Sequence, residues 1–114
     1  GDVSGKNVLL VDDMIDTAGT ICGAADLLKI RGARSISVAA THGIFSPPAL
    51  DRINKSAINH IFITDTVPLK DEVLKNPKFR VVSVAPLLAE AINCIYNGDS
   101  ISGKLIPKSH GLER

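Results

Sequence analysis

The sequence predicts a three-layer α/β/α fold, in which helices cover both faces of a mainly parallel sheet. Short aliphatic runs alternate with segments of helical periodicity, which is typical of parallel α/β domains. The first run, residues 7–11, is almost entirely aliphatic, as expected for a strand covered on both faces. No internal repeat or linker interrupts the alternation, so we expect one domain spanning residues 1–114.

A helix is expected directly after residue 20. Its apolar residues recur at i, i+3, i+4 and i+7: Ile21, Ala24, Ala25 and Leu28. Gly32 follows the last of them and is a typical residue for the C-terminal end of a helix. The first strand and this helix together form one strand–turn–helix unit.

The later elements are assigned by the same rules. Runs rich in β-branched residues predict further strands at 35–40, 58–64 and 80–84. Helical patterns, two of them opened by proline, are found at 47–53, 70–74 and 86–97. The tail, residues 99–114, has a weak apolar alternation at 101–106, and we expect its last residues to be loose.

Charge and hydropathy exclude several classes of function. Thirteen Lys and Arg against twelve Asp and Glu give a net charge of +1, so no strong field favours nucleic acid or an anionic membrane. No apolar run approaches the roughly 20 residues that a membrane helix needs. No secretory signal is visible, and Cys22 and Cys94 lack Cys-x-x-Cys spacing, which predicts a cytoplasmic protein with reduced cysteines.

Three carboxylates surround the junction of the first strand and the first helix, in the stretch VLLVDDMIDTAGT at residues 8–20. Asp12 and Asp13 follow the aliphatic run, and ligands of parallel sheets bind beyond the carboxyl ends of the strands. The next residues supply helix N-terminal amides, two hydroxyls and a glycine that permits close approach: Asp16, Thr17, Ala18, Gly19 and Thr20. This segment is a candidate phosphate cradle.

Carboxylates repel a bare phosphate, so the acids and the amides are expected to contact different parts of one ligand. A phosphorylated sugar meets this requirement, because carboxylates accept hydrogen bonds from ribose hydroxyls and hold Mg²⁺ directly or through water. Simpler interpretations are that Asp16 or Thr17 caps the helix and that Asp12–Asp13 is a solvated turn. His42, at the expected end of the second strand, is either a structural histidine or a residue lining the site.

The stretch VDDMIDTAGT at 11–20 resembles the ribose-phosphate loop of type I phosphoribosyltransferase-fold proteins. Within that fold it is most similar to the ribose-phosphate diphosphokinases, also called phosphoribosyl pyrophosphate synthetases. Three further stretches resemble the same family: THGIFSPPALDRIN at 41–54, APLLAEAI at 85–92 and NGDSIS at 97–102. The resemblance covers nearly the whole chain and implies a phosphoribosyltransferase-like fold.

That family transfers diphosphate from ATP to the 1-hydroxyl of ribose 5-phosphate, with Mg²⁺, and supplies phosphoribosyl pyrophosphate for nucleotide biosynthesis. The resemblance implies that Asp12 and Asp13 are catalytic residues that hold the ribose hydroxyls, with Asp12 binding the metal directly or through water. It implies that residues 16–20 bind the 5-phosphate. It also implies that residues 1–114 form the C-terminal domain of a homo-oligomeric, commonly hexameric enzyme whose N-terminal domain binds most of the ATP. This chain alone is then expected to make no product.

Three other functions remain open at the level of the sequence. A noncatalytic relative would assemble with active synthetases and regulate them, although such relatives often alter this loop, which is intact here. A phosphoribosyltransferase would use the same loop but needs a base-binding hood that is not visible. A flavodoxin-like signalling domain would use the acid pair with Mg²⁺ and an acceptor such as Asp65, but the threonines at the helix start favour a sugar phosphate.

Overall fold

The chain divides into two compact units, Gly1–Ser83 and Val84–Arg114, where the sequence suggested one domain. The computed structural model describes residues 1–105. The expectation of a loose end to the tail falls on residues 106–114, outside the described residues.

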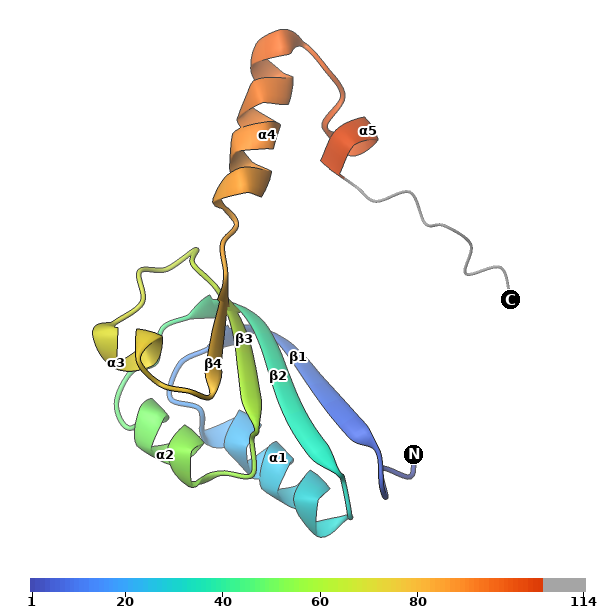
Figure 1. Ribbon diagram of the computed structural model, residues 1–114, viewed down its shortest axis with the longest axis vertical. Helices are drawn as coiled ribbons and strands as arrows, with labels where there is room; N and C mark the ends of the chain where they lie inside the picture. Colours follow the sequence, from blue (N-terminus) through green and yellow to red (C-terminus); the bar gives the residue numbers. More distant parts are fainter. Residues whose placement is uncertain (106–114) are drawn as a thin grey trace. The chain divides into compact units, whose positions relative to one another are not determined.

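The first unit is built on a four-stranded, all-parallel sheet (Figure 1). Its strands lie in sequence order: β1 (Asn7–Ile15), β2 (Ser35–Gly43), β3 (His60–Thr64) and β4 (Phe79–Val82). The predicted α/β class and the parallel sheet are confirmed. Because all four strands run the same way, the residues that follow them gather at one edge of the sheet.

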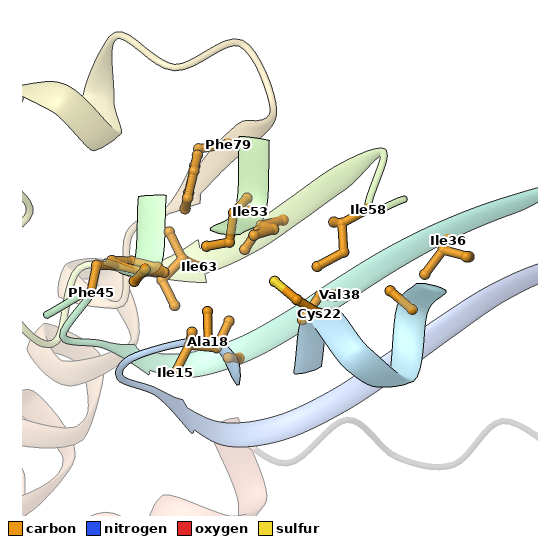
Figure 2. Close-up of a cluster of buried hydrophobic side chains, with 14 of the residues drawn as sticks. Ile15, Ala18, Cys22, Ile36, Val38, Phe45, Ile53, Ile58, Ile63 and Phe79 are labelled. Atoms are coloured by element: carbon orange, nitrogen blue, oxygen red, sulfur yellow. The ribbon is translucent and has the colours of Figure 1, made fainter. Parts of the chain in front are cut away.

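Helices α1 (Gly19–Ile30), α2 (Ala49–Lys55) and α3 (Asp71–Leu74) connect the strands. The three helices contribute to the same buried apolar cluster as the inward faces of the strands, and Figure 2 shows Cys22 of α1 in it beside Val38. Gly32 ends α1 as expected, with a φ of 90° that glycine adopts without steric cost. The core therefore lies between the sheet and one helical layer.

The opposite face of the sheet is uncovered in this unit, contrary to the prediction that both faces of the first strand are buried. Leu9 is 58% exposed, Val11 is 76% exposed and Phe62 is 41% exposed. Side chains alternate along a strand, so these residues face away from the cluster that α1 and α2 cover. An apolar strand sequence cannot distinguish one covered face from two, and within residues 1–83 only one is covered.

Strand β1 is longer than its aliphatic run. The ladder with β2 continues through Asp12 opposite Ala40 and Met14 opposite His42, and it closes with Ile15 opposite Gly43. The prediction that the strand ends at Val11 was therefore wrong. Aspartate has low strand propensity, but regular pairing with a nine-residue neighbour outweighs that local preference.

The second unit contains α4 (Ala85–Asn97) and α5 (Ile101–Leu105). Helix α4 has Pro86 in its first turn and ends at Gly98, whose φ is 68°, as the sequence predicted. The weak apolar alternation after residue 100 suggested no helix, yet α5 begins at Ile101. Lys104 of this helix forms an ion pair with Asp99 at 3.1 Å. Among the described residues, no helix combines the length and apolar character needed to cross a bilayer.

Both cysteines are buried and free, as expected. Cys22 lies on the inward side of α1, and burial is the main reason that the pKa of its thiol is raised above the ordinary value. A raised pKa lowers the thiolate fraction at neutral pH, and the thiolate is the reactive form. Cys22 is therefore an inert part of the core.

Candidate functional site

A hollow of about 290 Å³ lies where β1 passes into α1. It is lined by one continuous segment: Asp12, Met14, Ile15, Asp16, Thr17, Ala18, Gly19, Thr20 and Ile21. Six of the seven residues that the sequence singled out for ligand binding are thus brought together. Asp13 is the exception, since it does not line the hollow.

The backbone amides of this segment have free hydrogen-bonding capacity. Among the described residues, no acceptor is found for the N–H groups of residues 17–21, and the first bond of α1 runs from the Cys22 N–H to the Ala18 carbonyl at 3.1 Å. The first N–H groups of a helix have no partner within it, and together with the helix dipole they attract anions. The segment 17–21, here called the amide loop, therefore has the donors that a phosphate group requires.

Ala18 gives the amide loop its shape. It precedes α1 in the left-handed conformation, with φ 65° and ψ 10°, and its side chain is buried in the core. A residue with a Cβ pays about 1 kcal/mol or more for this conformation, so the surrounding structure must hold it there. The sequence singled out Gly19 for close approach of a ligand; the positive φ in this turn belongs to Ala18.

Neither Asp16 nor Thr17 caps the helix. Helix α1 has no side-chain hydrogen bond at its N-terminus. The Asp16 carboxylate instead accepts a long hydrogen bond, 3.4 Å, from the backbone N–H of Ser46, in the connection after β2. The capping interpretation is therefore wrong, and the helix N-terminus is left open to an external acceptor.

Asp12 and Asp13 are exposed and lie in β1 rather than in a turn beyond it. The backbone N–H of Asp13 donates to Asp12 Oδ1 at 2.8 Å. A side-chain hydrogen bond with Asp13 is the main cause that lowers the pKa of the Asp12 carboxyl below its ordinary value, and the hydrogen bond from the Asp13 backbone N–H adds to the effect. Asp12 is accordingly ionised at neutral pH, and together with Asp16 it lines the hollow beside the amide loop.

His42 is placed at the carboxyl edge of the sheet but is engaged within the protein. Its Nδ1 lies 2.7 Å from Oγ1 of Thr66. Asp65, the residue considered as an acceptor aspartate, accepts a hydrogen bond from the Ser83 hydroxyl at 2.7 Å. No group of three or more His, Cys, Asp or Glu side chains within residues 1–105 is arranged to hold a metal ion by itself.

Two residues of the stretch FSPPALDRIN, which the sequence suggested could shape the site without singling out either residue, contact it from the connection between β2 and β3. Ser46 holds Asp16 through its backbone, and Arg52 of α2 donates a hydrogen bond to the carbonyl of Thr17 at 3.1 Å. No local pattern reveals either contact, because the two segments are about thirty residues apart in the chain. Only the packing of α2 beside α1 brings them together (Figure 1).

The fold and the amide loop define a class of protein: parallel α/β domains that present an open helix N-terminus at the carboxyl edge of the sheet. Residues 1–105 match the family described as "Phosphoribosyl synthetase-associated domain", and the chain belongs to this family. The resemblance stated from the sequence is confirmed.

The chain is similar to curated proteins named ribose-phosphate pyrophosphokinase. It is 52% identical over 102 residues to that of Helicobacter hepaticus, covering 90% of this chain and 32% of the relative. To the protein of Chromobacterium violaceum it is 52% identical over 102 residues, covering 90% and 31%. The crystal structure of phosphoribosylpyrophosphate synthetase from Mycobacterium smegmatis matches with a TM-score of 0.82 and 43% identity, over 86% of this chain and 33% of that one. The chain thus spans about a third of the length of these relatives.

Proposed function

We propose that this chain supplies the ribose 5-phosphate site of a ribose-phosphate diphosphokinase. The observation that carries the proposal is the set of unpaired amides at residues 17–21 beside the ionised carboxylate of Asp12. The amides bind the 5-phosphate, and the Thr17 and Thr20 hydroxyls add donors. The ribose hydroxyls lie on the carboxylate side of the hollow. The anionic phosphate then meets N–H donors, and the carboxylate accepts hydrogen bonds from the hydroxyls. The names of the relatives support the same substrate class.

The proposed reaction needs no covalent intermediate on the protein. The 1-hydroxyl oxygen of ribose 5-phosphate attacks the β-phosphorus of ATP, the bond from that phosphorus to the α-phosphate oxygen breaks, and AMP leaves. The hydroxyl proton is released to water. Such transfers depend mainly on alignment and charge neutralisation. An aspartate carboxylate is a weak base, so Asp12 serves mainly to orient the attacking hydroxyl.

Mg²⁺ fits this site in the mode it commonly uses, with one or two carboxylates and the remaining positions filled by water and substrate oxygens. Asp12 would hold it directly or through water, and Asp13 would orient Asp12 and add a second negative charge. When bound, the ion neutralises charge on the transferred diphosphate. We propose further that ATP is bound mainly by a preceding domain and that the intact protein forms homo-oligomers.

A titration followed by NMR tests the phosphate assignment. Ribose 5-phosphate added to the 114-residue chain is expected to shift the amide signals of residues 17–21, because these N–H groups gain a charged acceptor. Ribose, which lacks the phosphate, should leave them in place at the same concentration. Shifts confined to other regions, or equal shifts with ribose, would count against the assignment.

A further inference from the structure

Arg52 contacts the amide loop but does not line the hollow. Its Nη1 donates to the carbonyl oxygen of Thr17 at 3.1 Å. A Cβ built on Gly19 would lie 3.2 Å from the same Nη1. The missing side chain at Gly19 therefore makes room for the guanidinium group, in addition to any role toward a ligand.

The geometry of the peptide bond links this contact to the hollow. The bond between Thr17 and Ala18 is trans, and in a trans peptide the C=O and N–H groups point in opposite directions. When Arg52 holds the Thr17 carbonyl, the Ala18 N–H is directed away from α2, and Ala18 lines the hollow. A rotated peptide would place a carbonyl oxygen where the phosphate is expected.

Arg52 also brings a positive charge to the amide loop. The ion pairs among residues 1–105 join Lys55 to Asp51 and Lys104 to Asp99, and Arg52 takes part in neither. A cation one peptide unit behind an anion site adds to the field of the helix N-terminus. Hydrogen bonds that involve a charged donor are stronger than neutral ones, which suits the guanidinium for holding a strained turn.

We propose that Arg52 is a positioning residue for phosphate binding. It fixes the Thr17–Ala18 peptide so that the Ala18 N–H faces the hollow, without touching the substrate itself. This inference rests on the proposed function, because it assigns Arg52 a role at the same site.

The test compares Arg52→Met with Lys55→Met in the full 114-residue chain. Both changes remove one positive charge from exposed positions of α2 that border the same groove beside α1. Lys55 reaches Asp51 and has no bond to the amide loop. Ribose 5-phosphate is titrated into each variant, and the amide signals of Ala18 and Gly19 are recorded before and after the addition.

Arg52→Met is expected to shift the Ala18 and Gly19 signals in the ligand-free chain and to raise the Kd for ribose 5-phosphate about tenfold, the factor that 1.4 kcal/mol gives. Lys55→Met should leave these signals in place and change the Kd less than about twofold. Arg52→Lys keeps the charge and a donor, so it should restore the Kd to within about threefold. If Arg52→Met fails to fold, Arg52→Gln replaces it.

The outcomes separate this inference from the proposed function. Absence of binding to the unchanged chain overturns the proposed function, and this inference with it. If Arg52→Met and Lys55→Met bind ribose 5-phosphate with the same Kd, and the Ala18 and Gly19 signals do not move, only the role of Arg52 is overturned. A lower thermal stability without either change would show that Arg52 is merely structural, which also contradicts the inference.

Discussion

Asp12→Asn is expected to weaken Mg²⁺-dependent binding of ribose 5-phosphate about tenfold or more. The substitution keeps the size of the side chain but removes the charge that attracts the metal and strengthens hydrogen bonds to ribose hydroxyls. Hydrogen bonds to a charged group contribute about 1.5–3 kcal/mol, which corresponds to roughly tenfold or more in affinity. Isothermal titration calorimetry with and without Mg²⁺ measures the change.

A matched control for this variant is Asp71→Asn. Asp71 is an exposed aspartate at the start of α3 and does not line the hollow. Its substitution removes the same charge and should alter the affinity less than about twofold, since exposed charges at a distance are screened by salt. Equal losses in both variants would mean that the effect is general electrostatics, and the role of Asp12 would be rejected.

Ile63→Ala is expected to lower the free energy of unfolding by about 2–5 kcal/mol. Ile63 is 1% exposed and packs in the core under the end of β2, where a Cβ on Gly43 would lie 2.8 Å from it. Figure 2 shows its side chain within the buried cluster. Loss of its methyl groups leaves a cavity in the core beside Gly43. Urea unfolding followed by circular dichroism measures the loss.

Ile30→Ala provides the comparison for stability. Ile30 ends α1 and is 81% exposed, so truncation removes little buried surface. We expect a change within about 0.5 kcal/mol, the usual range for surface positions. A cost at Ile30 equal to that at Ile63 would contradict the assignment of the core to the space between the sheet and the helical layer.

The order of strands and helices was predictable because each element carries its own periodicity and end signals. Gly32 and Gly98 mark the ends of α1 and α4 in both the sequence and the structure. The extension of β1 past Val11 was not predictable, because it arises from pairing with β2. For the same reason, the sequence placed the acid pair in a turn, while the structure places it within the strand.

The amide loop was predictable as a segment, but its geometry was not. Spacing alone indicated a helix N-terminus with threonines, and the structure brings those residues around one hollow. Three features depend on tertiary packing: the positive φ at Ala18, the placing of Asp12 but not Asp13 in the lining of the hollow, and the contact with Arg52. Contacts between residues far apart in the chain leave no signal in a single sequence.

A crystal structure of the chain with ribose 5-phosphate tests the central claim most directly. We predict phosphate oxygens about 2.7–3.2 Å from backbone nitrogens of the amide loop, the usual range for such hydrogen bonds, with the ribose hydroxyls on the side of Asp12. A phosphate group bound elsewhere, with the amides of residues 17–21 left without it, would contradict the account.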